Sequence, residues 1–83
     1  MIGLGADIAL VLAENKGEVR ISGRQTDDCY SKYGLNLAAI MQAIAPVIEG
    51  SGGGHALAAA ANGTKDGAEG LKKAIEMIEE ELG

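Results

Sequence analysis

The single histidine of the chain, His55, follows four glycines within five positions in the stretch GSGGGH, residues 50–55. Because glycine has no Cβ, successive main-chain N–H groups can converge there into a concave nest that binds anionic oxygens. The imidazole at the exit of this loop could donate a hydrogen bond to a phosphate, and a helix N-terminus there would add to the attraction. A flexible turn with a surface histidine is the simpler interpretation. The clustered glycines and the alanines that follow them favour an anion site.

A second group suited to anions lies in EVRISGR, residues 18–24, whose apolar and polar residues alternate as in a half-buried strand. The alternation places Arg20, Ser22 and Arg24 on one face and the apolar residues on the other. A guanidinium can bind a phosphate through two parallel hydrogen bonds. Ser22 and Arg24 therefore share a face on which an anion could be held.

Two strands and a turn are predicted in the first part of the chain. The run DIALVLAE, residues 7–14, is short and nearly continuously apolar, which indicates a buried strand. The turn signal NKG at 15–17 joins it to the alternating strand at 18–24, so the two form a hairpin. Residues 25–34 are polar, and we expect them to be irregular.

Two helices are predicted in the remainder of the chain. Asn36 is suited to cap the first, whose apolar residues 37, 40, 41, 44 and 48 follow helical spacing. Pro46 should kink or end this helix, because proline lacks the N–H donor and clashes with the preceding turn. The second helix covers residues 66–82, where Asp66 and Glu69 form a start like a capping box.

Residues 55–63 are ambiguous, since alanine favours a helix but glycines bracket the segment closely enough for a turn that leads into a short strand. The order of elements predicts an α/β (α+β) fold. It has a small mixed sheet with an N-terminal hairpin, two main helices packed on that sheet, and a glycine-rich loop before a short turn or strand.

Composition limits the classes of function. The 83 residues carry a net charge of −5, which argues against a general nucleic-acid surface and leaves local recognition of an anion by a few groups. No apolar run is long enough to span a membrane, so we expect no membrane partner. The single cysteine, Cys29, excludes an internal disulfide and fits a reducing, cytoplasmic location.

The chain offers little for catalysis. Metal chemistry needs several converging ligands, whereas this sequence has one histidine and acids that lie mostly along one helix. Outside the acidic last helix, Asp27 and Asp28 form the only tight acidic pair, and a solvated loop with a half-buried Cys29 is favoured there over a metal site. No serine or cysteine has an adjacent base. We therefore expect no catalytic residue, metal or cofactor in this chain.

Three segments resemble the DHH-associated domain, the C-terminal substrate-binding domain of DHH/RecJ-like phosphoesterases. They are VRISGR at 19–24, YGLNLAAIMQAIAPVIEG at 33–50 and GSGGGHALAAAA at 50–61. The form GLNLA.IM is similar to archaeal RecJ-like single-strand nucleases, and the triple glycine with histidine is the most specific element. The resemblance covers roughly residues 8–82.

The resemblance implies that residues 1–83 form a single DHH-associated-type domain from which the catalytic DHH domain is absent. Manganese or magnesium would be held by that missing domain. The expected partners are that domain and a single-stranded nucleic acid, an oligonucleotide or a nucleotide phosphate. By the resemblance, phosphate or nucleotide binding falls to six residues: Ser22, Arg24, Gly52, Gly53, Gly54 and His55.

The chain departs from the family pattern at Ala60, where members usually have glycine after a pair of alanines. If that position needs a positive φ, an alanine there is strained by about 1–2 kcal/mol.

Two other functions remain open. The chain could be a protein-interaction module or a homodimer, using the apolar strand at residues 8–13 and the acidic last helix. It could instead be the substrate domain of an oligoribonuclease or a 3′-phosphoadenosine-phosphate phosphatase. The associated domain of alanyl-tRNA synthetases is less favoured, because the histidine of the loop is a feature of the RecJ branch.

Overall fold

The two long strands are joined by a tight turn at the position that the sequence predicts. In the computed structural model, which describes residues 2–3 and 7–82, β2 (Ile8–Asn15) and β3 (Glu18–Gln25) pair as an antiparallel hairpin. Lys16 and Gly17 have φ values of 44° and 82°, and positive φ at both central residues is the mark of a type I′ turn. The predicted hairpin is confirmed to within one residue at its ends.

Three more strands complete the sheet. β1 (Ile2–Gly3) pairs with β2, while β5 (Ala58–Gly63) pairs with β3 on one side and with β4 (Ser51–Gly54) on the other. The order is β1-β2-β3-β5-β4, and all four pairings are antiparallel. The α/β (α+β) class is confirmed, but the described strands form an antiparallel sheet rather than a mixed one, because tight turns join β2 to β3 and β4 to β5.

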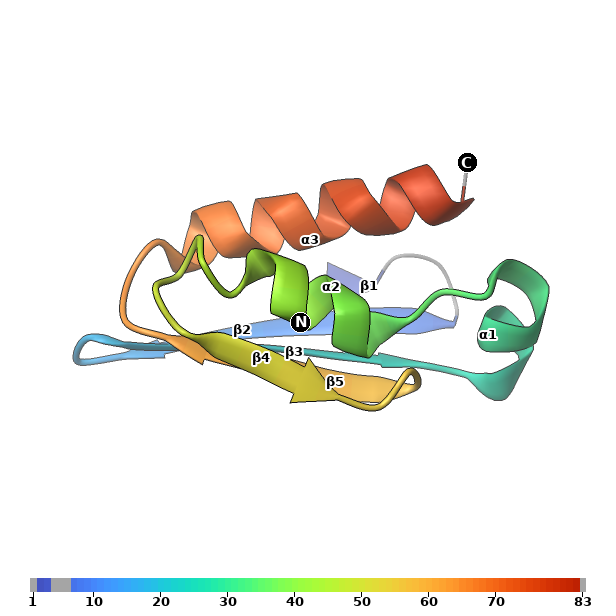
Figure 1. The fold of residues 1–83 in the computed structure, drawn as a ribbon, viewed down its shortest axis with the longest axis horizontal. Helices are drawn as coiled ribbons and strands as arrows, with labels where there is room; N and C mark the ends of the chain where they lie inside the picture. The colour runs from blue at the N-terminus through green and yellow to red at the C-terminus, as the bar shows by residue number, and fades with distance from the viewer. Residues whose placement is uncertain (1, 4–6, 83) are drawn as a thin grey trace.

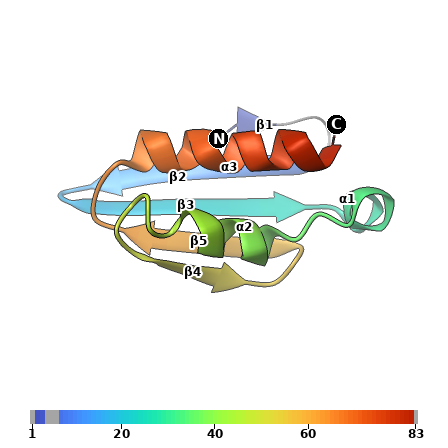
Figure 2. The same cartoon turned by 45° about the horizontal axis from the view of Figure 1, so that its top comes forward.

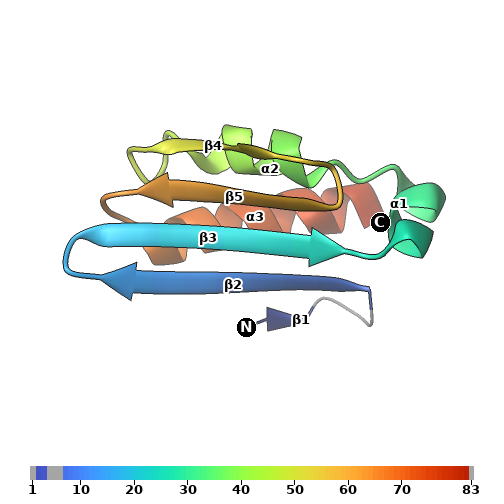
Figure 3. The ribbon, with the colours of Figure 1, turned by 90° about the horizontal axis from the view of Figure 1, so that it is seen from below.

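The two main helices cover one face of this sheet. α2 (Leu37–Ile44) and α3 (Gly67–Leu82) lie side by side on the same side of the strands (Figures 1 and 2). Viewed from the opposite side, the strands lie in front of both helices and nothing in the described chain covers them (Figure 3). The predicted layer of helices on a sheet is therefore confirmed, with one face left open.

The ends of α2 follow the predicted signals. The side chain of Asn36 accepts a hydrogen bond of 3.2 Å from the amide of Ala39, which caps the helix. The helix ends at Ile44, before Pro46. Both predictions are confirmed. None of the helices in the described part of the chain is long and apolar enough to cross a membrane.

Residues 25–34 differ from the expectation, because α1 (Asp27–Tyr33) forms where irregular chain was predicted. The hydroxyl of Thr26 accepts a hydrogen bond of 3.2 Å from the amide of Cys29. Gly34 ends the helix in the left-handed conformation, with φ of 67°. A helix of only seven residues is too short to show a stripe of apolar residues in the sequence. The only sequence signals for this helix are therefore its capping residues, Thr26 and Gly34.

The core lies between the sheet and the two main helices. Leu10 and Ile21 from the sheet, Met41 and Ile44 from α2, and Ile78 from α3 are all fully buried. This one-sided core fixes which strand residues face inward, and it leaves the alternate residues of β2, β3, β4 and β5 on the open face.

A candidate phosphate-binding surface

The glycine stretch is a strand, not a loop. Residues Ser51–Gly54 form β4 at the edge of the sheet, and a two-residue turn joins it to β5. The amide of His55 donates to the carbonyl of Ala58 over 2.8 Å, and the amide of Ala58 donates back to His55 over 3.2 Å. The expectation of a glycine loop is wrong for these residues, because pairing with β5 holds them extended.

This strand changes where the main-chain N–H groups point. Hydrogen-bonded and non-hydrogen-bonded pairs alternate along an antiparallel ladder, and His55 with Ala58 is a hydrogen-bonded pair. Counting back along the register, Gly53 and Ser51 also direct their N–H groups toward β5. Only Gly52 and Gly54 direct theirs toward the free edge. The expected nest of converging amides does not form, since the N–H groups of a strand alternate in direction.

The three consecutive positions, 52 to 54, differ in whether and why the structure requires glycine. At Gly52 a Cβ would lie 2.6 Å from the carbonyl carbon of Met41, so α2 rests directly on this residue. Gly54 has φ of 134°, and its Cβ would lie 2.7 Å from the Cα of Ala59. Gly53 has no such reason, because the nearest atom to its Cβ would be 4.0 Å away, in the side chain of Gln42. The fold requires glycine at two positions and leaves Gly53 to be explained.

The register places the predicted residues in rows across the open face. Ser22 lies opposite Ala60, which in turn lies opposite Gly53. Arg24 lies opposite Ala58, the partner of His55 in the turn. Predicted residues from β3 and from the glycine stretch are therefore neighbours on a single surface.

A hollow of about 600 Å³ occupies this part of the open face, and we call it the Arg24 hollow. Arg20 and Arg24 supply its charged groups, Ser22 its hydroxyl, and Gly53 and Gly54 part of its border. Four of the six predicted residues therefore line the same hollow. Its remaining lining consists mainly of small side chains, with Ala9, Ala58 and Ala60 among them.

Two predicted residues lie outside the lining of the Arg24 hollow. Gly52 is directed toward Met41 of α2, where its missing side chain permits close packing. His55 is exposed at the start of the turn, in the row of Arg24. The structure thus gives Gly52 a packing role and leaves His55 exposed, outside the lining of the hollow.

The charge of the Arg24 hollow is opposite to that of the chain. Among the described residues, those that line it include two arginines and no carboxylate, although the chain has a net charge of −5. Both ion pairs found within residues 2–3 and 7–82 involve Lys65, which lies 2.9 Å from Glu49 and 3.9 Å from Asp66. Neither guanidinium is neutralised by these pairs, so both remain available to an anion.

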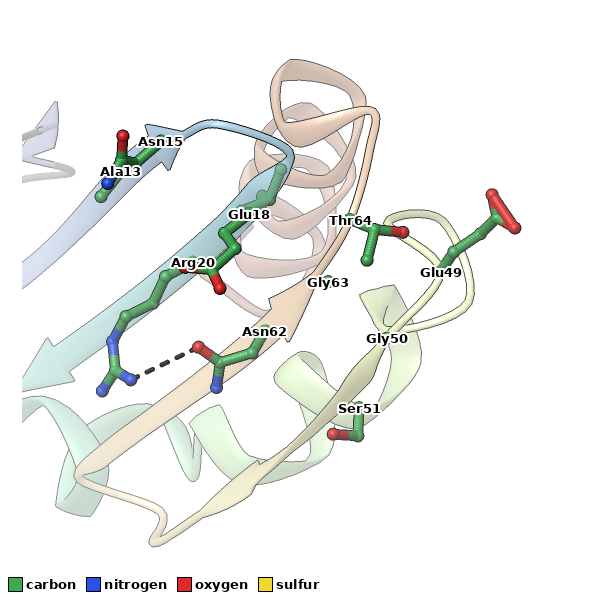
Figure 4. Close-up of a pocket in the computed structure, with 11 residues that line it drawn as sticks. Ala13, Asn15, Glu18, Arg20, Glu49, Gly50, Ser51, Asn62, Gly63 and Thr64 are labelled. Carbon is green, nitrogen blue, oxygen red and sulfur yellow. Dashed lines mark hydrogen bonds between the residues drawn. The ribbon is translucent and has the colours of Figure 1, made fainter.

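Arg20 is the residue that the prediction of binding sites missed. Its Nη1 donates to the Oδ1 of Asn62 over 3.4 Å, across from β3 to β5 (Figure 4). The signal was present in the sequence, since Arg20 shares a strand face with Ser22 and Arg24. No motif assigned it a role, and only the register shows that its row continues the same surface.

Ala60 carries no strain. It lies within β5, and it is not among the residues with positive φ. The condition under which an alanine would be strained at this position is therefore not met. Its methyl group lines the Arg24 hollow, between the strands that carry Ser22 and Gly53.

Gln25 fixes the turn that carries His55. This side chain is buried, and its Nε2 donates both to the carbonyl of Leu35 and, over 2.7 Å, to the carbonyl of Ala56. Its main-chain amide donates over 3.0 Å to the carbonyl of Leu57. One residue at the end of β3 thus holds both central residues of the turn.

The acidic pair and the cysteine do not form a reactive centre. Asp27 and Asp28 lie in the first turn of α1, where carboxylates interact favourably with the helix dipole. Cys29 is buried, and its burial, with a smaller effect of Asp7, raises the pKa of the thiol. No group of three or more histidine, cysteine, aspartate or glutamate side chains in the described residues is arranged to ligate a metal ion.

Comparisons with known proteins agree with this architecture. An uncharacterised protein of Methanocaldococcus jannaschii is 35% identical over 80 residues, which cover 94% of this chain and 24% of that protein. The chain therefore spans about a quarter of the length of this relative. The C-Ala domain of Aquifex aeolicus alanyl-tRNA synthetase superposes with a TM-score of 0.68 over 90% of this chain and 64% of that one. At 17% sequence identity, this likeness concerns the fold.

The sequence profile of the DHHA1 domain matches residues 4–83. This range includes the β3 strand with Ser22 and Arg24, the glycine strand and both main helices. Because the match spans nearly the whole chain, the chain belongs to the DHHA1 domain family.

Proposed function

We propose that this DHHA1 domain binds phosphate groups of single-stranded nucleic acid or of nucleotides, as the substrate-gripping part of a RecJ-like DHH phosphoesterase. The observation that carries the proposal is the Arg24 hollow, whose lining in the described part of this acidic chain includes no carboxylate and two guanidiniums that belong to neither ion pair. The charge of this hollow is therefore opposite in sign to the net charge of the chain. Recognition of an anion accounts for this local positive charge.

The arrangement fits a phosphate held from several sides. Arg24 can supply two parallel N–H donors, and the hydroxyl of Ser22 lies on the same face of the same strand. His55 lies two strands away in the row of Arg24, about 10 Å across the sheet, which two side chains reaching toward one ligand can span. Gly53 leaves space for the ligand to approach the backbone, because the fold itself does not fill that position.

Hydrolysis would take place on another domain. The described residues of this chain hold no set of ligands that fits a manganese or magnesium ion, and such ions need several oxygen ligands. We infer that the DHH domain supplies the metal site and that the DHHA1 domain positions the phosphate chain against it. A cytoplasmic location belongs to the same proposal.

The test is a titration of the chain with a fluorescent 5′-phosphorylated oligothymidylate at fixed salt. Arg24→Ala should weaken binding about 10- to 100-fold, since a hydrogen bond to a charged group contributes about 1.5–3 kcal/mol. His55→Ala should weaken it less, because this residue lies outside the lining of the hollow. Lys72→Ala is the matched control, as it removes one positive charge from an exposed position of α3 on the helix side of the sheet.

Equal losses in Arg24→Ala and Lys72→Ala would show a response to net charge alone and would refute the proposal. If the oligonucleotide does not bind at all and size-exclusion chromatography shows a stable dimer, the interaction-module alternative takes its place.

A further inference from the structure

The Arg24 hollow continues along the open face beyond Ser22. A second hollow of about 640 Å³ adjoins it, and Asn62, Ser51 and Thr64 are among the residues that line it (Figure 4). Arg20 is the one residue that lines both hollows. It therefore stands at their junction, and a ligand that extends past Ser22 meets its guanidinium.

The spacing of Arg20 and Arg24 along β3 suits two separate phosphates. They lie four residues apart on one face of β3, so their backbones are separated by about 13 Å. A hydrogen bond of 3.4 Å joins the guanidinium of Arg20 to Asn62, which lies opposite it on β5. This separation exceeds one sugar–phosphate repeat, so the two arginines match phosphates with an intervening nucleotide between them.

Carboxylates mark where this surface ends. Glu18 is the next residue of β3 on the same face after Arg20, and it lines the second hollow together with Glu49. Glu49 is partly neutralised by Lys65 at 2.9 Å, whereas Glu18 has no part in either ion pair of the described chain. A further phosphate would be repelled there. The positive stretch of the open face thus extends from Arg24 to Arg20 and stops.

We propose that Arg20, held over β5 by Asn62, is a second phosphate subsite, and that the open face therefore binds a single strand of three or more nucleotides in preference to a mononucleotide. The inference rests on the proposed function, because it extends the site at Arg24. It also distinguishes an oligonucleotide substrate from the nucleotide-phosphatase alternative. The uncharged polar groups of the second hollow receive the sugar and base that follow the second phosphate.

A length series of 5′-phosphorylated oligothymidylates tests this subsite, with the mono-, di-, tri- and hexanucleotide titrated into the full chain by isothermal calorimetry. The affinity should rise about tenfold between the dinucleotide and the trinucleotide, and little beyond. Arg20→Ala should remove this step and should weaken mononucleotide binding much less than Arg24→Ala does. The same variant should lower the salt dependence of trinucleotide binding by about 0.7 in the slope of log K against log salt.

Two further variants examine the mechanism. Asn62→Ala removes the hydrogen bond that holds the Arg20 guanidinium over β5. It should therefore reduce the gain in affinity from dinucleotide to trinucleotide only a few-fold. Glu18→Gln removes the carboxylate at the end of the surface, so it should make the hexanucleotide bind more tightly than the trinucleotide. Arg20 is exposed on the open face, so its removal leaves the buried core unchanged. A far-ultraviolet circular dichroism spectrum verifies the fold of each variant.

The outcomes separate the two proposals. A flat length series, or equal losses for mononucleotide and hexanucleotide in Arg20→Ala, overturns the second subsite while Arg24→Ala still weakens every ligand. If Arg24→Ala has no effect on any member of the series, the proposed function fails and the second subsite fails with it.

Discussion

Gly52 and Gly53 are adjacent residues of one short strand, and substitution by alanine should change the free energy of unfolding in opposite directions at the two positions. A methyl group at Gly52 would lie 2.6 Å from the carbonyl carbon of Met41, whereas an ordinary contact needs at least 3.4 Å. The carbonyl oxygen of Met41 would be closer still, and because the opposing atoms are backbone, α2 must retreat as a whole by roughly 1 Å. Its residues Leu37, Met41 and Ile44 are fully buried, and each would lose packing contacts.

Gly52→Ala should therefore lower the free energy of unfolding by about 1–3 kcal/mol, the usual cost of forcing extra volume into a packed region. Gly53→Ala should raise it by about 0.4–1 kcal/mol, because the site is open and its φ is not positive, so alanine only restricts the unfolded chain. In urea denaturation followed by circular dichroism, the midpoint should fall by about 1–3 M for the first variant and rise slightly for the second.

The stabilised variant also tests the site. Because the new methyl group would stand on the border of the Arg24 hollow, Gly53→Ala should weaken oligonucleotide binding in a protein that is at least as stable as the natural one. If Gly53→Ala is as destabilising as Gly52→Ala, the assignment of the packing role to Gly52 alone is refuted. If it is stable and binds normally, Gly53 does not border the ligand.

Two further predictions concern buried groups. Gln25→Glu should lower the free energy of unfolding by about 1–3 kcal/mol, because a carboxylate would face the carbonyls of Leu35 and Ala56 in place of the amide donor. Gln25→Met removes the donor without adding charge, so it should lower the free energy of unfolding by less. The reverse order of the two variants in urea titrations would contradict this account. Burial raises the pKa of the Cys29 thiol above its ordinary value of 9.0. The contribution of the thiol to the free energy of unfolding is therefore complete below pH 9.0, where the folded and the unfolded states both hold the proton. It is lost as the pH rises through the higher pKa of the folded state. Unfolding midpoints at pH 7 and pH 10 should therefore diverge more for the natural protein than for Cys29→Ala, and equal divergence would show that the thiol titrates normally.

Much of the fold is predictable because its signals are local. The turn at Lys16–Gly17, the cap at Asn36 and the stop before Pro46 each depend on a few adjacent residues, and all three were identified correctly. The strand at Ser51–Gly54 could not be predicted in this way. Glycine has low intrinsic preference for strands, and this one is held by pairing with β5 and by the approach of α2.

The candidate site was predictable in part for the same reason. Ser22 and Arg24 share a face by strand alternation, which the sequence shows directly. That Arg20 belongs to the same surface depends on the pairing of β3 with β5, which joins residues about forty positions apart. The different tasks of Gly52 and Gly53 depend on where α2 crosses the strand, and no sequence pattern contains that information.

The buried amide of Gln25 has a mechanical consequence. It is bonded both to Leu35, in the segment that leads into α2, and to Ala56, whose carbonyl also accepts a hydrogen bond of 3.1 Å from the amide of Leu37. The turn that carries His55 is thereby tied to the start of α2 behind the sheet. Through these hydrogen bonds, a displacement of that connecting segment would reach the turn as well, so the two parts behave as one mechanical unit.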